Sequence, residues 1–179
     1  MLRTRRLLLP ALGVLLVFAS TAGGAANRAP AGQLARIARV VDGDTVALTN
    51  GRRVRLVQID TPEVYSSPEC YGNQASKITK HLLRPGAAVR LLREPKTDAV
   101  DAYGRLLRYV IRIRGHLNVN VQLVRVGAAA PYFYDYRRGR YAGLLVRLGR
   151  RAQRRHLGLW GRCPGTPWDP NHGVSTGPA

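Results

Sequence analysis

The chain has 179 residues, with 29 Lys and Arg against 10 Asp and Glu, and a formal net charge of +19 at pH 7. A protein with this net charge is expected to bind polyanions, and the binding is expected to weaken as the salt concentration rises. Because nearly all of the cations are Arg, nucleotide composition alone is an alternative source of the bias. The charge therefore supports a nucleic-acid partner without establishing one.

Residues 1–26 are predicted to be a signal peptide. Arg3, Arg5 and Arg6 precede an apolar run over residues 7–19, and small residues follow it. The run is shorter than the ~20 apolar residues of a membrane span, so a cleaved leader is favoured over a retained anchor. Arg5-Arg6 leaves both the general and the twin-arginine export routes open. We expect a secreted protein with no stable membrane insertion after the leader is cleaved.

Residues 27–32 are expected to be a flexible lead-in, residues 33–163 one folded domain, and residues 164–179 a tail that frays from Asn171. About 150 residues remain after the leader, enough for a single core. Alternating apolar positions predict strands, and Asn50-Gly51 is the clearest hairpin turn. The predicted strands cover residues 34–41, 45–48, 54–59, 88–92 and 106–113.

Helices are predicted over residues 68–83, 118–126 and 137–156. Asn118 can cap the second helix and Gly127 can end it. The arginine-rich face of the last helix is expected to be a solvated surface, as are Glu94, Asp98 and Asp135. Five short strands with a helix after the third and helices at the end predict an α+β fold: an OB-fold five-stranded β-barrel with three α-helices.

Cys70 and Cys163 are the only cysteines. In an exported chain they favour a disulfide, although two separate buried thiols remain the alternative. A bridge would close a loop of about 90 residues and stabilise the fold by about 4–5 kcal/mol in the chain-entropy model. Neither cysteine has a His or Cys at metal-ligand spacing, so a cysteine metal site is not expected.

The acidic residues are unevenly distributed, because Asp42, Asp44, Asp60 and Glu63 lie close together in the sequence beside turns. Asp44 follows the first hairpin turn and Asp60 ends the third strand, so pairing of strands two and three would bring their carboxylates together. Two carboxylates with the Thr61 carbonyl and waters suit a hard cation such as Ca²⁺. The alternative is that residues 42–44 form only a turn, and that residues 60–63 only follow a strand and cap the segment after it.

Other side chains fit phosphodiester hydrolysis. Glu63 is near enough in sequence to act as a general base on water. Arg55 and Arg105 can each donate two parallel N–H bonds to phosphate oxygens. Tyr132 and Tyr134 can stack on a base or donate to a phosphate. Taken singly, an arginine such as Arg105 is more often an ordinary surface residue, and the two tyrosines more often cover the end of a barrel.

The ordered combination of motifs is far more specific than any one of them. The motifs are Asp42-Gly-Asp-Thr45, Arg55-Leu-Val-Gln-Ile-Asp-Thr-Pro-Glu63, Tyr71-Gly-Asn-Gln-Ala75, Asp101-Ala-Tyr-Gly-Arg105, Pro131-Tyr-Phe-Tyr134 and Gly158-Leu-Trp-Gly161. In this order they resemble the thermonuclease, or staphylococcal nuclease-like, family over residues 33–163. The resemblance implies an OB-type barrel and Ca²⁺-dependent hydrolysis of DNA and RNA to products with 3′-phosphate ends.

The resemblance also implies a role for each matching position. Asp44, Asp60 and the Thr61 carbonyl would hold Ca²⁺, and Asp42 would lie next to these ligands without binding the ion itself. Arg55, Glu63 and Arg105 would be catalytic, and Tyr103, Tyr132 and Tyr134 would contact the nucleotide. Two positions depart from the family pattern. Ala102 replaces a Lys that is common before the tyrosine at this place, here Tyr103, and the segment over residues 64–68 is shorter than the long mobile loop of the best-known member.

We therefore predict an exported, monomeric Ca²⁺-dependent endonuclease acting on DNA and RNA. The alternatives are a cationic OB-fold protein that binds nucleic acid without cutting it, and a cationic protein acting on anionic cell surfaces. Neither alternative requires the ordered carboxylates, which repel phosphate.

Overall fold

A computed structural model describes residues 32–179 of the chain. The predicted signal peptide and nearly all of the predicted lead-in lie outside these residues. Within the described range, no helix is both long enough and apolar enough to cross a membrane.

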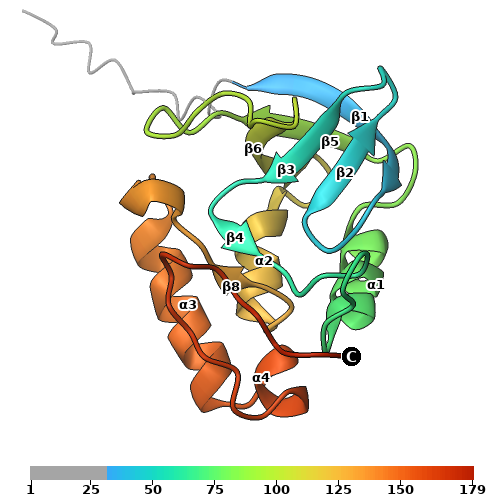
Figure 1. Ribbon diagram of the computed structural model, residues 1–179. Coiled ribbons are helices and arrows are strands. Elements are labelled where there is room, and N and C mark those ends of the chain that lie inside the picture. The colour runs from blue at the N-terminus through green and yellow to red at the C-terminus, as the bar shows by residue number, and fades with distance from the viewer. Residues whose placement is uncertain (1–31) are drawn as a thin grey trace, which may run out of the picture.

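A closed five-stranded barrel forms the upper half of the molecule in Figure 1. Its strands are β1 (Gln33–Val40), β2 (Thr45–Leu48), β3 (Arg53–Leu56), β5 (Ala88–Leu92) and β6 (Leu106–Arg112). The order β3-β2-β1-β5-β6 is antiparallel throughout, and a parallel pairing of β3 with β6 closes the barrel. Gly51, with a φ of +81°, makes the predicted turn between β2 and β3.

Helices and short strands complete the α+β architecture below the barrel. They are α1 (Gly72–Leu82), α2 (Val119–Arg125), α3 (Ala142–Arg154), the one-turn α4 (Leu159–Arg162), the 3-10 turn η1 (Tyr134–Tyr136), β4 (Ile59–Asp60), β7 (Leu117–Asn118) and β8 (Ala130–Pro131). The Asn118 side chain accepts from the Val121 N–H, as expected of a cap. The predicted OB-type barrel with three longer helices is confirmed.

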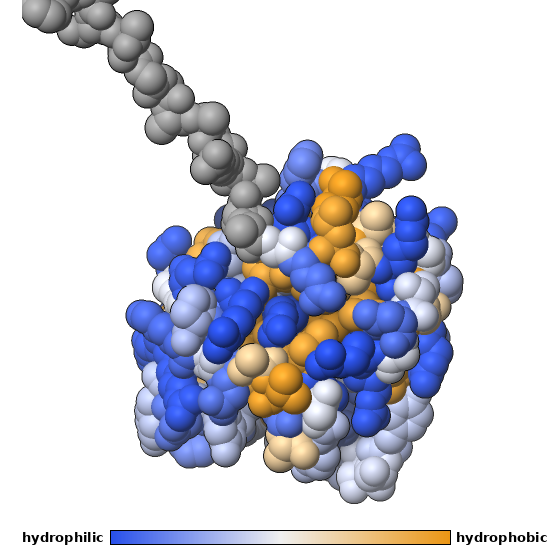
Figure 2. All heavy atoms as spheres, turned by 90° about the horizontal axis from the view of Figure 1, so that it is seen from above, coloured by the Kyte–Doolittle hydropathy of each residue, from blue (hydrophilic) through white to orange (hydrophobic). Residues whose placement is uncertain are grey.

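The core lies between the barrel and the helices. Fully buried Ile37, Leu56 and Val110 from the strands meet Leu123 of α2 and Leu145 of α3, and burial of this apolar surface stabilises the arrangement. Seen from above, the barrel face carries apolar side chains among hydrophilic ones in Figure 2. Exposed Leu34 of β1 lines a hollow of about 560 Å³.

The third strand is shorter than predicted because Gln58 breaks it. Gln58 has a φ of +65°, and its side-chain oxygen accepts from the Tyr109 hydroxyl and the Gly139 N–H. The backbone turns there, and Ile59–Asp60 leaves the barrel to pair with Ala130–Pro131 as β4 and β8. The interruption therefore carries Asp60 from the barrel towards the helices.

Two helices begin later than predicted. Pro68 and Cys70 are held in an extended segment by hydrogen bonds with Ala179 and Gly177, so α1 starts only at Gly72. The start of the predicted last helix is extended at Arg137 and packs at Gly139 against Glu94, so α3 starts at Ala142.

Two expectations about the surface were wrong. Glu94 is only 2% exposed, because its carboxylate accepts from the N–H and Nε of Arg140. Residues from Asn171 onward do not fray, and Val174 is buried against Leu159 and Trp160. Sequence composition alone gives no sign of this docking.

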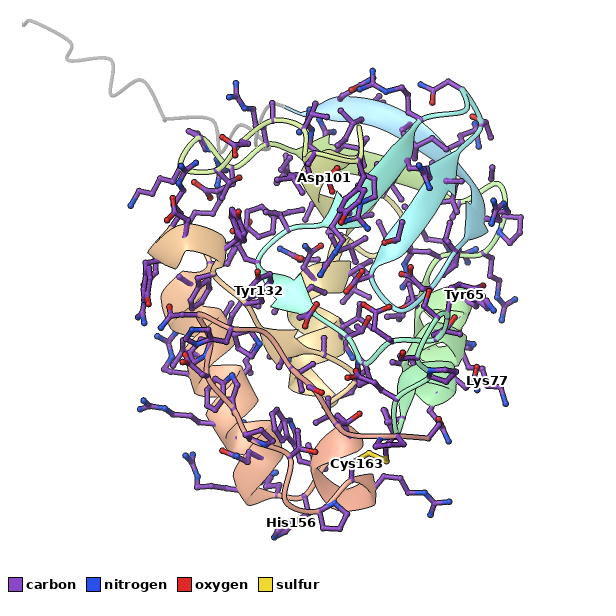
Figure 3. All side chains as sticks on the ribbon, in the orientation of Figure 1. Tyr65, Lys77, Asp101, Tyr132, His156 and Cys163 are labelled. Carbon is purple, nitrogen blue, oxygen red and sulfur yellow. A yellow bond between two sulfur atoms is a disulfide. The ribbon has the colours of Figure 1, made fainter. Side chains whose placement is uncertain are left out.

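The predicted disulfide is present. Cys70, just before α1, is bonded to Cys163, just after α4, across a sequence separation of 93 residues. Figure 3 shows the sulfur pair between these two helices.

Candidate active site

A largely buried group of two carboxylates and one guanidinium lies where β2, β3 and β4 meet: Asp44 is buried, and Arg55 and Asp60 are half-buried. Arg55 Nη1 is 2.9 Å from Asp44 Oδ2, and Arg55 Nη2 is 2.7 Å from Asp60 Oδ1. Arg55 Nη1 also donates to the Ile59 carbonyl at 2.8 Å. Register explains the convergence, because Thr45 lies opposite Arg55 in the β2–β3 ladder and Asp60 follows the break at Gln58.

Backbone and hydroxyl donors hold Asp44 in place. Asp44 Oδ2 accepts from the N–H and the hydroxyl of Thr61, at 3.1 and 3.0 Å. Asp42 does not reach this group directly. Its Oδ1 accepts from the N–H groups of Asp44 and Thr45, at 3.0 and 2.7 Å, so Asp42 fixes the turn that presents Asp44.

Both carboxylates have lost much of their contact with water, Asp44 more than Asp60. Burial raises the pKa of Asp44 to about 7, outweighing the lowering by Arg55. Burial likewise raises the pKa of Asp60, although Arg55 and the Val174 N–H counteract it. The single positive charge of Arg55 therefore does not compensate the two negative charges of Asp44 and Asp60. A further positive charge would stabilise the ionised forms of both carboxylates.

In the metal-free protein we expect the free energy of unfolding to fall as the pH rises from about 4 to about 7. Folding raises the pKa of Asp44 from 3.8 to about 7, so its contribution is fully present below 3.8 and is lost as the pH rises through the folded value. Denaturant unfolding in chelator at several pH values measures this. Asp44→Asn, which cannot titrate, should have a flatter profile, and equal profiles would contradict the assignment.

Glu63 lies at the surface beside this group. Burial, Asp60 and Asp42 raise its pKa, in that order of size, which makes its carboxylate a stronger base than an ordinary glutamate. The segment that follows Glu63 is fixed, because the Tyr65 hydroxyl donates to the Val41 carbonyl at 3.0 Å.

Arg105 reaches the same edge of the barrel from the turn before β6. Its Nε donates to Asp101 Oδ2 at 2.7 Å, and its Nη1 donates to the Thr45 hydroxyl at 3.3 Å. Thr45 donates in turn to Asp44. Burial raises the pKa of Asp101, but the hydrogen bonds from Arg105 lower it further than that. Asp101 thus orients Arg105, a role that was not predicted from the sequence.

The predicted nucleotide contacts line one pocket of about 520 Å³. Arg55, Arg105, Tyr103, Tyr132 and Tyr134 all lie on its wall. Tyr103 and Tyr134 are 76% and 71% exposed, although Arg105 lies over one face of the Tyr103 ring and Tyr134 packs edge to face with Tyr132. Figure 3 labels Asp101 and Tyr132, which lie on the barrel side and the β8 side of the pocket.

The donor chemistry suits a hard cation. Asp44 and Asp60 both contact Arg55, and the Thr61 N–H donates to Asp44. Carboxylate and carbonyl oxygens are the ligands that Ca²⁺ prefers. Across residues 32–179 there is no cluster of three or more His, Cys, Asp or Glu side chains arranged for a metal. A cation here would thus rely on two carboxylates, the carbonyl and water.

A barrel that gathers buried acids and two arginines beside a tyrosine-lined pocket defines a phosphodiester-cleaving hydrolase, a nuclease. A family model described as staphylococcal nuclease homologue matches residues 53–162, and the chain belongs to this family. Two similar proteins, from Escherichia coli O157:H7 and Escherichia coli, are each named "Uncharacterized endonuclease". Both are 34% identical over 137 residues, which cover 74% of this chain and 81% of their own length.

Proposed function

We propose that this nuclease is an exported, Ca²⁺-dependent endonuclease that hydrolyses DNA and RNA to products with 3′-phosphate ends. The observation that carries the proposal is the sharing of one guanidinium, that of Arg55, by the buried carboxylate of Asp44 and the half-buried carboxylate of Asp60. A divalent cation would complete the charge balance of this group. Mere binding of nucleic acid requires no buried acids.

Asp44, Asp60 and the Thr61 carbonyl would hold the ion. When bound, Ca²⁺ supplies positive charge that polarises the scissile phosphate. Glu63 accepts a proton from the water whose oxygen forms the new bond to phosphorus. Arg55 and Arg105 stabilise the charge that develops on the phosphate oxygens. The bond from phosphorus to the 5′-oxygen breaks, and that oxygen takes a proton from bulk water to become a 5′-hydroxyl, while Glu63 returns its proton to solvent.

The pocket beside this centre would receive the nucleotide. Tyr103, Tyr132 and Tyr134 offer ring faces and hydroxyl groups, a combination that accepts any base. Stacking of this kind and the +19 charge support action on both DNA and RNA.

Export is supported by the disulfide. Bonds such as Cys70–Cys163 persist in oxidising compartments and are rare where thiols are kept reduced. The leader predicted over residues 1–26 fits the same destination.

The decisive experiment is cleavage of single-stranded DNA by the purified protein, with Ca²⁺ and then with a chelator, followed by analysis of the new ends. We expect fragments with 3′-phosphate and 5′-hydroxyl ends that appear only with Ca²⁺. Retention of DNA without cutting under both conditions would identify a binding protein instead. Cutting in chelator would remove the metal from the mechanism.

A further inference from the structure

Residues 169–179, which we call the strap, cross the molecule beside the proposed active site. The Pro170 carbonyl accepts from the Phe133 N–H at 2.6 Å, near the pocket. At the other end, the Ala179 N–H donates to the Pro68 carbonyl at 3.0 Å, before α1. Figure 1 shows this path as the dark red segment that runs from α3, past β8, to α1.

Midway, the strap holds Asp60. The Val174 N–H donates to Asp60 Oδ2 at 2.9 Å, while Arg55 holds Asp60 Oδ1 at 2.7 Å. The backbone approaches closely at Gly173, where a Cβ would lie 2.6 Å from Asp60 Oδ2 and the φ is +79°. Only glycine fits there. The two oxygens of this carboxylate are therefore fixed from opposite sides.

The next residue of the strap reaches Glu63 through Glu69. The Ser175 hydroxyl donates to Glu69 Oε1 at 2.8 Å, and Glu69 Oε2 accepts from the Glu63 N–H at 3.0 Å. The Glu69 N–H also donates to the Glu63 carbonyl, at 2.9 Å. Consecutive strap residues are thus connected to the proposed metal ligand and to the proposed general base.

We propose that Val174 and Ser175 are positioning residues of the nuclease: the Val174 amide orients Asp60 for the cation, and the Ser175 hydroxyl orients Glu63 through Glu69. The inference rests on the proposed function for the roles of Asp60 and Glu63. Hydrogen bonds that orient a metal ligand are worth about 10–100-fold in metal affinity or activity. The strap is far from Asp60 and Glu63 in sequence, so it acts only in the folded chain.

Val174→Pro tests the first contact, because proline has no N–H to donate. We expect the dissociation constant for Ca²⁺, measured by titration calorimetry without substrate, to rise about 10–100-fold. Val174→Ala keeps the N–H and is the matched control, with Ca²⁺ binding near that of the unchanged protein. Equal affinities for the proline variant and the control, with both proteins folded, would overturn this role.

Ser175→Ala tests the second contact at a site where loss of folding is not expected. We expect kcat to fall about threefold to tenfold, the equivalent of one hydrogen bond, with KM and Ca²⁺ affinity unchanged. Ser175→Thr, which keeps the hydroxyl, should restore kcat. An unchanged kcat in Ser175→Ala, or no recovery in Ser175→Thr, would overturn the link to Glu63.

The unchanged protein separates this inference from the function on which it rests. If it binds Ca²⁺ and cuts DNA while the variants behave as it does, the positioning roles fail and the nuclease mechanism stands. If it neither binds Ca²⁺ nor requires it, the proposed function fails and the positioning roles fail with it.

Discussion

Replacing Glu63 by Gln is expected to lower kcat by about 10²- to 10⁴-fold, the usual contribution of a positioned general base. The amide has nearly the same shape but cannot take a proton from water. Because Glu63 lies at the surface, the change should leave the fold and its thermal stability intact. Its raised pKa, caused by burial and by Asp60 and Asp42, should also set the acidic limb of the pH–rate profile.

The matched control is Asp135→Asn, which makes the same chemical change at an exposed acid paired with Arg137. It should cut DNA at the normal rate. Single-turnover cleavage gives the chemical step, and fluorescence anisotropy of labelled DNA gives retention, which Glu63→Gln should keep within about threefold, since no binding arginine is lost. Normal turnover in Glu63→Gln would remove this residue from the mechanism.

The sequence predicted the centre of the site because its signals are local. Asp44 follows a turn, Asp60 ends a strand, and the β2–β3 ladder sets Thr45 opposite Arg55. Hairpin register follows from the Asn50-Gly51 turn, so the meeting of Asp44 with Arg55 needed no knowledge of distant packing, whereas the place of Asp60 depends on the break at Gln58. The five barrel strands were readable for the same reason, since period-two patterns and turn residues act over a few positions.

What escaped the sequence depends on contacts between distant segments. The break at Gln58 requires partners at Tyr109 and Gly139, and no local pattern marks a left-handed glutamine. Glu94 resembles any surface acid until Arg140 is placed beside it. The strap has the composition of a loose end, yet its Ser175 and Thr176 hydroxyls donate to Glu69 and Cys70, about 100 positions earlier in the chain. The amino-acid composition of a segment indicates how readily water solvates it, whereas the docking of the strap depends on how its shape fits the rest of the fold.

The disulfide connects these long-range features. Cys70 lies in the segment that carries Glu69, and Cys163 directly follows α4, a few residues before the strap begins. The Cys70 backbone is itself held by the strap, through the Thr176 hydroxyl at 2.6 Å and the Gly177 carbonyl at 2.9 Å. The segment that carries Glu69 is therefore bonded covalently to the end of α4 and hydrogen-bonded to the strap.

Replacing both Cys70 and Cys163 by Ser is expected to lower the free energy of unfolding by about 4–5 kcal/mol, because the unfolded chain loses its 93-residue crosslink. The midpoint of thermal unfolding should fall by roughly 10–20 °C for a domain of this size. Unfolding in denaturant with and without reductant measures both effects. The unchanged protein should become as unstable as the double variant on reduction, whereas the variant should not respond.

Activity distinguishes a passive crosslink from one that maintains the site. If the disulfide serves only global stability, the double variant should cut DNA normally wherever it is fully folded. If the bond also holds the strap against the Glu63 segment, kcat should fall at 25 °C while the barrel remains folded. We expect the second result, since the hydrogen bonds from Thr176 and to Gly177 involve the Cys70 backbone itself. An unchanged kcat in the folded double variant would limit the bond to a stabilising role.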